Sequence, residues 1–316
     1  MDQTLVDTSC KLLQRCMGVK PGEKLLVVAD DPKKDIGEAL YEAAKRVGAE
    51  AMLMVMSERD KSGQEPPEPV SEAMKRSDVV VCVTRHSLTH TKARKEAVAH
   101  GARIATMPGI TRDMFLEGAV AADYDQVKRL TERVTELLGR GDRVRIEKDG
   151  RSLTFSIAGR VGVASTGVYR NPGESGNLPS GEGYIAPVEG SGSGRIVVDG
   201  SIAGIGRIDS PVELTIENGR LVEATGAAAG RLLDMLGDGD GRMLGEFGIG
   251  TNDKARITGV VLEDEKVYGT IHVAFGSNHT FGGTIEAGVH IDLVVSRPDV
   301  YVDDVKMMDR GRLLLD

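Results

Sequence analysis

The sequence predicts an N-terminal α/β domain with a mostly parallel sheet, followed by a glycine-rich domain built mainly from antiparallel strands. The first observation behind this prediction is that continuous apolar runs alternate with helical patterns in the N-terminal part. The second is that 10 of the 40 glycines precede position 142 and 30 follow it. A boundary near Gly139-Arg140-Gly141 therefore predicts domains over residues 1–140 and 141–316.

Strands and helices alternate through the first domain. The apolar runs have the length of strands and contain few polar residues, so we expect both faces of each strand to be buried. Between these runs, apolar residues recur with helical spacing. The expected order is strand 24–30, helix 34–47, strand 51–56, helix 69–76, strand 79–84, helix 91–100 and strand 102–107, closed by an amphipathic helix over 124–138.

Short strands separated by glycine and aspartate are expected in the second domain, with one helix over 227–236. VELTIE at 212–217 alternates as a half-buried antiparallel strand does, and ENGR at 217–220 is a tight-turn sequence. The expected strands are 143–148, 152–158, 194–202, 212–219, 256–262, 266–276 and 289–295.

Composition limits the partners of the chain. Its 40 Lys and Arg against 48 Asp and Glu give a formal net charge of -8, which argues against a nucleic-acid partner, because such binding needs a basic surface. No apolar run approaches the roughly 18 residues of a membrane span, and no secretory signal is evident, so we expect a cytoplasmic protein without a membrane partner. Cys10, Cys16 and Cys82 form no CxxC pair, which argues against disulfides and structural zinc.

Glycine-rich segments do not predict a nucleotide site. The turn after the first strand reads DDPKKDIG, where a dinucleotide-binding fold would carry GxGxxG. GSGSG at 190–194 and GIGTN at 248–252 lack the lysine and the following helix that a phosphate loop requires. The candidate chemistry lies instead among histidines and carboxylates.

Three of the six histidines, His272, His279 and His290, fall within nineteen residues. Side chains two apart on a strand share a face, so His290 and Asp292 project together as a nitrogen and an oxygen ligand. A hairpin across the glycine-rich 276–288 segment would bring His272 opposite this pair. This pattern favours a metal site; the alternative is that the histidines face solvent on alternating strands.

Two carboxylates support the metal interpretation. Glu182 in NLPSGEGYIAP and Glu246 in LGEFGIGTN are each expected in a loop flanked by glycine, where backbone can come close to an ion or a substrate. A glutamate in a glycine loop is also often simply solvated. Neither residue alone predicts a site.

Taken in order, Glu182, Glu246, His272, His290 and Asp292 resemble the metal-site residues of the M29 metallo-aminopeptidases, the aminopeptidase T and S group. The segments NLPSGEGYIAP, GEFGIGTN, IHVAFG and HIDLVV carry the resemblance, which spans nearly the whole chain. It implies a hydrolase, usually a homodimer, that removes N-terminal residues from small peptides with two divalent ions, Zn, Co or Mn, held by these five residues. A metal-activated water would attack the peptide carbonyl.

The resemblance also implies catalytic roles for two residues. Glu182 is positioned as a metal ligand or as the general base, and both roles stay open. Seven residues after His272 the aminopeptidases usually carry a tyrosine that stabilises the oxyanion, whereas this chain has His279. This histidine could donate the same hydrogen bond or bind metal instead.

A second expectation comes from another reaction class, because the family also resembles the iron-dependent 2,5-dihydroxypyridine dioxygenases. There, His272 or His279 with His290 and Asp292 would form a facial triad for Fe(II), and a small aromatic molecule would be the substrate. Glu246 favours the aminopeptidase, because it supplies the additional ligand that a second metal needs. A non-catalytic metal-binding or ligand-binding protein on the same scaffold is the third expectation.

Overall fold

The computed structural model describes residues 2–315, which divide into two compact units. The first unit contains the chain up to Lys128 together with Gly167–Ser180, and the second contains Arg129–Thr166 and the chain from Gly181 onward. These two units differ in two ways from the expected division at residue 140. Helix α6 (Tyr124–Arg140) begins in the first unit and continues into the second, and residues 167–180 return to the first unit.

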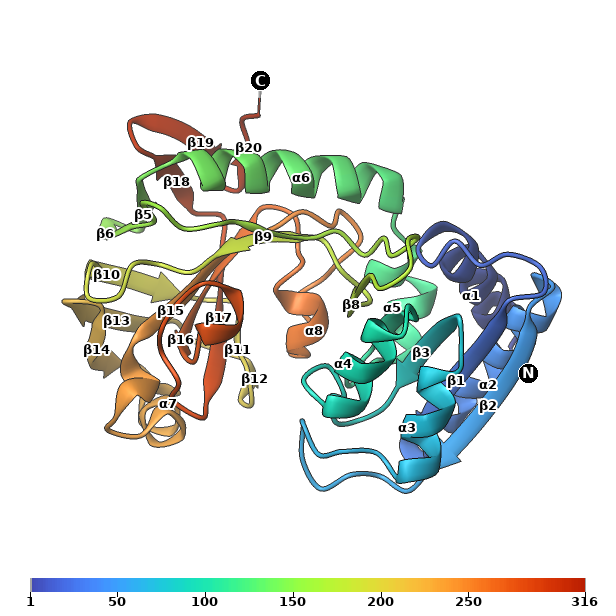
Figure 1. The fold of residues 1–316 in the computed structure, drawn as a ribbon. Helices are drawn as coiled ribbons and strands as arrows, with labels where there is room; N and C mark the ends of the chain where they lie inside the picture. Colours follow the sequence, from blue (N-terminus) through green and yellow to red (C-terminus); the bar gives the residue numbers. More distant parts are fainter. Residues whose placement is uncertain (1, 316) are drawn as a thin grey trace. The chain divides into compact units, whose positions relative to one another are not determined.

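The first unit is a five-stranded parallel sheet with helices on both faces (Figure 1), which confirms the expected α/β class. Its strand order is β2-β1-β3-β4-β8. All five residues of β3 and six of seven in β1 are buried, because helices pack on each side. The elements are α1 (Gln3–Arg15), β1 (Lys24–Asp30), η1 (Asp31–Lys33), α2 (Lys34–Arg46), β2 (Glu50–Met56), α3 (Glu68–Lys75), β3 (Val79–Val83), α4 (Lys92–Ala99), β4 (Arg103–Thr106), α5 (Arg112–Leu116), η2 (Ala119–Ala121) and β8 (Ser175–Asn177).

The second unit consists of an eight-stranded and a seven-stranded sheet, in which every strand pair is antiparallel. This confirms the expected β-rich class. The first sheet, in the order β14-β13-β10-β6-β5-β18-β19-β20, contains β5 (Arg143–Lys148), β6 (Arg151–Ser156), β10 (Ser193–Val198), β13 (Val212–Glu217), β14 (Arg220–Thr225), β18 (Asp299–Val302), β19 (Val305–Asp309) and β20 (Arg312–Leu313). The second, in the order β12-β11-β17-β16-β15-β9-β7, contains β7 (Val163–Ser165), β9 (Glu182–Ile185), β11 (Ser201–Ile202), β12 (Gly206–Arg207), β15 (Leu244–Gly250), β16 (Thr270–Gly276) and β17 (His290–Ser296).

One apolar core lies between these two sheets. Phe155 of β6 meets Phe247 of β15 edge to face at 5.4 Å between ring centroids. The hairpin turn at Asn218-Gly219 between β13 and β14 is confirmed, and both residues have positive φ, as a tight turn of this kind requires. The unit also contains helices α7 (Ala229–Leu236) and α8 (Val261–Asp264) and the short helices η3 (Asp240–Arg242) and η4 (His279–Phe281).

The expected strand over 256–262 is wrong. The chain is irregular up to Val260 and then forms α8. The Asp264 carboxylate accepts hydrogen bonds from the backbone N–H groups of Thr258 and Gly259, which folds the segment back on itself. Such side-chain bonds to backbone compete with strand pairing.

The expectation that Glu182 and Glu246 lie in loops is also wrong, because both lie on strands, β9 and β15. Their neighbouring glycines lower strand propensity and so suggest loops. In the structure, however, Gly248 and Gly250 lie where other groups approach too closely for any side chain.

Within residues 2–315, no helix has the length and apolar character needed to cross a bilayer. Cys10, Cys16 and Cys82 are free thiols. Burial raises the pKa of the Cys16 and Cys82 thiols, so these two side chains behave as small apolar core residues.

Candidate metal centre

Strands β15, β16 and β17 have two chemically opposite faces. One face is apolar and belongs to the core between the sheets. The other carries the acids and histidines together with small residues and Val294. The core face consists of Phe247, Ile249, Ile271, Val273, Phe275, Ile291, Leu293 and Val295.

The strand register brings the expected site residues together on the second face. The hairpin between β16 and β17 forms as expected, with His272 and His290 on neighbouring strands. Strand β9 adds Glu182 at the far side of β15. The rows across the face are His290 with Gly276, then Asp292 with Ala274 and Glu246, then His272 with Gly248, then Glu182 with Gly250.

Glu246 contacts both histidines of this face. Its Oε1 lies 3.2 Å from Nε2 of His272, and its Oε2 lies 3.3 Å from Nε2 of His290. Nε2 of His290 is also 3.4 Å from Oδ1 of Asp292. One donor atom from each of Glu246, His272 and Asp292 lies within 4.8 Å of the others. Glu246, His272 and Asp292 are therefore close enough to ligate one ion, and His290 adjoins them through its contacts with Glu246 and Asp292.

A backbone contact orients the His290 ring. Its Nδ1 lies 2.8 Å from the carbonyl oxygen of Ser277, which only accepts, so Nδ1 carries the proton and donates it. Nε2 faces Glu246 and Asp292 and donates to them when protonated; once it loses that proton, its lone pair is free to bind a metal. A metal-binding histidine typically has its second nitrogen held in this way.

Gly248 makes room for His272. A Cβ at position 248 would lie 2.1 Å from Nε2 of His272, so no other residue fits without moving the ring. With glycine there, the imidazole lies across β15 and reaches to 3.6 Å from Oε2 of Glu182 on the next strand. The glycine that argues against a strand is therefore what allows the histidine to reach the centre.

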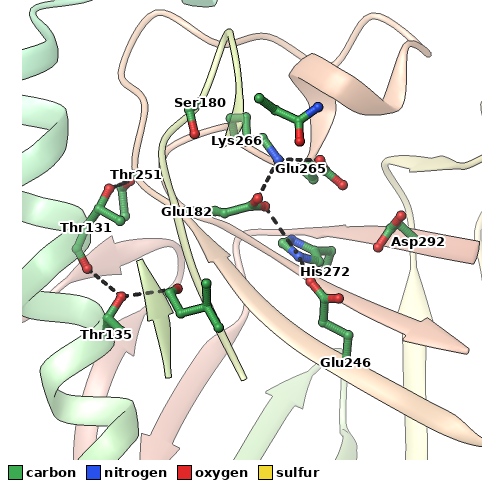
Figure 2. A network of polar contacts seen from close by, with 12 residues as sticks. Thr131, Thr135, Ser180, Glu182, Glu246, Thr251, Glu265, Lys266, His272 and Asp292 are labelled. Atoms are coloured by element: carbon green, nitrogen blue, oxygen red, sulfur yellow. Dashed lines mark hydrogen bonds and ion pairs between the residues drawn. The ribbon is translucent and has the colours of Figure 1, made fainter. Parts of the chain in front are cut away.

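Two further residues of the site, Glu265 and Lys266, were not expected from the sequence. Nζ of Lys266 lies 2.5 Å from Oε1 of Glu182 and also contacts the Glu265 carboxylate. Figure 2 shows Glu182 between Lys266 and His272. Burial would lower the pKa of Lys266, but these two carboxylates raise it, so the side chain is an ammonium ion. Their only sequence signal is the charged run EDEK at 263–266, and such runs are usually solvated.

Backbone contacts hold Lys266 at the end of β15. The Asn252 N–H donates to the carbonyl of Lys266 at 2.8 Å, and the Tyr268 N–H donates to the carbonyl of Asn252 at 3.0 Å. A Cβ at Gly250 would lie 2.1 Å from the carbonyl oxygen of Val267. Glycine at 250 thus allows the lysine segment to approach, as glycine at 248 does for His272.

Carboxylates raise the pKa of both imidazoles. Burial alone would lower the pKa of His272, but the hydrogen bond to Glu246 and the charge of Glu182 outweigh it and raise the pKa to about 9. Desolvation likewise opposes the raised pKa of His290, which Asp292 and Glu246 produce. Burial would raise the pKa of Glu246, yet the hydrogen bonds from the two histidines hold it below its ordinary value. The centre therefore attracts cations strongly.

The donor set fits a divalent metal. Four carboxylates, those of Glu182, Glu246, Glu265 and Asp292, converge on two imidazoles and one lysine. Oε2 of Glu182 is buried and has no hydrogen-bond partner among the described residues. Burial raises the pKa of Glu265 to about 8, and the other buried carboxylates are stable only next to cations. Nitrogen and oxygen ligands of this kind suit Zn, Fe, Co or Mn, and Glu246, His272, His290 and Asp292 are the residues that could hold the ion.

His279 has a different environment. It is exposed, and its Nδ1 lies 3.3 Å from the carbonyl oxygen of Ile285. Phe281, two residues later, approaches the centre and packs edge to face against His290 and against Tyr184, with centroids 6.1 Å and 5.4 Å apart. Tyr184 follows Glu182 by two residues on β9 and so shares its face. Tyr184 and Phe281 form an aromatic rim beside the candidate ligands.

Comparison with known proteins shows which folds the chain resembles. A search of curated proteins found no match. Among solved structures, the chain is similar to the 2,5-dihydroxypyridine dioxygenase of Pseudomonas putida KT2440, with a TM-score of 0.82 and 19% identity over 99% of this chain and 97% of that one. It is also similar to AmpT from Thermus thermophilus, an M29 aminopeptidase, with a TM-score of 0.72 and 20% identity over 99% of both chains. At these identities the likeness shows a shared fold, and it confirms that both expected families use this scaffold.

The family itself comes from a different comparison. A family model described as NicX, 2,5-dihydroxypyridine 5,6-dioxygenase, matches residues 4–315. That match includes both units and every candidate ligand. The chain therefore belongs to the NicX family.

Proposed function

We propose that the protein is an Fe(II)-dependent dioxygenase that opens a hydroxylated pyridine ring or a closely related one. This reverses the order of the two functions expected from the sequence. The observation that carries the proposal is the convergence of His272, His290 and Asp292 on one sheet face, in a chain that belongs to a dioxygenase family. Two histidines and one carboxylate with open positions are typical of non-haem iron oxygenases.

His272, His290 and Asp292 would hold the iron. Fe(II) bound there supplies the activation of dioxygen that ring opening needs. Both atoms of dioxygen enter the product in a dioxygenase reaction, so no external reductant is required. Glu246 contacts both imidazoles and would hold their orientation, whether or not it also ligates the ion.

Neighbouring residues would bind and deprotonate the substrate. Oε2 of Glu182 is a buried carboxylate oxygen without a donor, placed 3.6 Å from Nε2 of His272. It is positioned to accept the proton of a ring hydroxyl. The rings of Tyr184 and Phe281 would pack against a planar aromatic molecule, which supports an aromatic substrate over an extended peptide.

The test is turnover by protein reconstituted with Fe(II) without oxygen. On addition of air and 2,5-dihydroxypyridine, we expect equimolar loss of dioxygen and of the ring absorbance. The His290→Ala variant should show neither. Hydrolysis of aminoacyl-anilides by the Zn, Co or Mn form, with no consumption of dioxygen, would contradict the proposal.

One observation favours the aminopeptidase as the second candidate. Donor atoms of Glu182, Glu265 and His272 also lie within 4.8 Å of one another, as a second metal position would require. Dinuclear hydrolases need two such positions side by side. The identity of whatever cation lies between Glu182 and Glu265 therefore separates the two candidates.

A further inference from the structure

A lysine lies where a second metal ion would bind. Glu182, Glu265 and His272 could together ligate an ion beside the first centre. Nζ of Lys266, however, already lies 2.5 Å from Oε1 of Glu182 and contacts the Glu265 carboxylate. Figure 2 shows both contacts on the side of Glu182 away from His272.

We propose that the ammonium group of Lys266 takes the place of a second metal ion, so that the centre holds one exchangeable ion and one built-in cation. The inference rests on the proposed metal centre, and it argues against the dinuclear aminopeptidase, which would need the second position. It assigns Lys266 the role of fixing the metal stoichiometry at one ion per chain.

Charge repulsion disfavours a second ion beside the lysine. An ion bound to Glu182 would lie about 2.0–2.2 Å from a carboxylate oxygen. Nζ of Lys266 is 2.5 Å from that same carboxylate, so the two cations would lie within a few ångströms of each other. In a buried site with little water to screen them, their repulsion is large. Lysine has to leave before an ion can enter.

The lysine cannot easily leave. Its side chain is almost completely buried, and its backbone carbonyl is held by the Asn252 N–H at 2.8 Å. Gly250 brings the same segment against the end of β15, with no space for a side chain between them. Displacing Nζ would leave the buried Glu182 carboxylate with only His272, 3.6 Å away, as a cationic neighbour, which is unfavourable.

His272, the histidine of the group formed with Glu182 and Glu265, lies closer to the first centre. Its Nε2 is closer to Glu246 at 3.2 Å than to Glu182 at 3.6 Å. One imidazole nitrogen ligates one ion. With His272 on the first ion, the second position has only two carboxylates, and Lys266 already neutralises them.

The experiment counts metal ions on the full-length protein. Metal-free protein is saturated with Zn(II), and separately with Fe(II) without oxygen, and bound metal is measured by elemental analysis after gel filtration. We expect one ion per chain for the wild type and for Lys266→Arg, which keeps the charge. We expect two for Lys266→Met, which keeps the length of the side chain but removes its charge. The double variant Lys266→Met, Glu265→Gln should return to one, because the second position loses a ligand.

Two results would overturn the proposal: two ions per chain in the wild type, or one ion in a Lys266→Met protein whose circular dichroism shows it folded. If Lys266→Met does not fold, a wild-type crystal soaked in millimolar Zn(II) decides, since anomalous density between Glu182 and Glu265 contradicts the proposal and its absence there supports it. No bound ion at all in the wild type would refute the metal centre itself. That result differs from the two-ion result, so the failures can be told apart.

Discussion

The two faces of strands β15, β16 and β17 carry opposite kinds of side chain. On one face, side chains such as Leu293 pack into the core between the sheets. On the other, Asp292 and His290 lie close to Glu246, beside the small residues Gly248, Ala274 and Gly276. Alternation along each strand therefore separates stability from chemistry, because neighbouring residues point to opposite faces.

The comparison also shows what the functional face costs. Burying several carboxylates beside histidines is unfavourable without a cation, whereas apolar burial contributes about 25 cal/mol per Å² of buried area. The small residues Gly248, Ala274 and Gly276 contribute almost no packing to this face. They leave the space in which the long polar side chains reach one another.

The largest expected effects come from two separate substitutions at adjacent positions of β17, one on each face of the sheet. Asp292→Ala should weaken metal binding by more than about a hundredfold and abolish turnover while the thermal midpoint of the metal-free protein stays within a few degrees, because it removes a ligand and an excess negative charge. Leu293→Ala should do the reverse and lower the free energy of unfolding by about 2–5 kcal/mol with metal affinity retained. Calorimetric metal titration and denaturant unfolding measure both. Loss of metal in Leu293→Ala at temperatures where it remains folded would show that the faces are not independent.

The next largest effect is expected for Gly248→Ala. The added Cβ would lie 2.1 Å from Nε2 of His272, so the ring has to rotate away from Glu182 and Glu246. We expect metal affinity to fall at least about tenfold, the scale for disturbing a ligand's support. Gly230→Ala is the matched control, because nothing lies within 4 Å of a Cβ there. Equal metal affinity in both variants would show that the position of the His272 ring does not matter.

The stability of the metal-free protein should depend on pH through His272. Its pKa is about 9 in the folded chain against an ordinary 6.5, so folding binds a proton in that range. The stabilisation, up to about 3 kcal/mol, is complete below pH 6.5 and is lost as pH rises through 9. Metal displaces this proton, so metal affinity should rise with pH up to about 9, while the loaded protein should lack the loss of stability. Thermal midpoints at pH 6.5 and 9.5, measured with and without Zn(II), test this prediction. An equal change in midpoint between the two pH values for the metal-free and the Zn(II)-loaded protein would contradict it.

The smallest expected effect concerns the aromatic rim. Phe281→Leu removes the edge-to-face contacts with Tyr184 and His290, each of which is worth about 0.5–1.5 kcal/mol. We expect KM for an aromatic substrate to rise severalfold with metal content unchanged. Thr280→Ala, an exposed neighbour on the same turn, is the control. A fall in metal content for Phe281→Leu would mean that the ring positions His290 and does not bind substrate.

The main architecture follows from local sequence patterns. Continuous apolar runs such as VVVCV at 79–83 indicate parallel strands covered on both sides, and that is how β3 lies. Alternation in HIDLVV places His290 and Asp292 on one face of β17, and the glycine-rich segment before it forms the connection to β16. These features depend on residues close in sequence, which is why one amino-acid sequence is enough to predict them.

The rest of the site depends on approach distances that no local pattern encodes. Gly248 and Gly250 resemble loop glycines in sequence, yet they lie inside or at the end of β15, because His272 and Val267 come within contact there. Glu265 and Lys266 belong to a charged run that reads as solvated surface, and only the pairing of Asn252 with Val267 turns the lysine inward. Charge composition alone does not distinguish a buried ion network from a surface.

The most direct test of the central claim is the position of iron in crystals grown without oxygen, measured by anomalous scattering at the iron edge. We expect one peak, in contact with Nε2 of His272, Nε2 of His290 and the Asp292 carboxylate, with Lys266 still bound to Glu182. A peak between Glu182 and Glu265, or two peaks of similar height, would contradict a single-ion centre on the polar face of β15, β16 and β17.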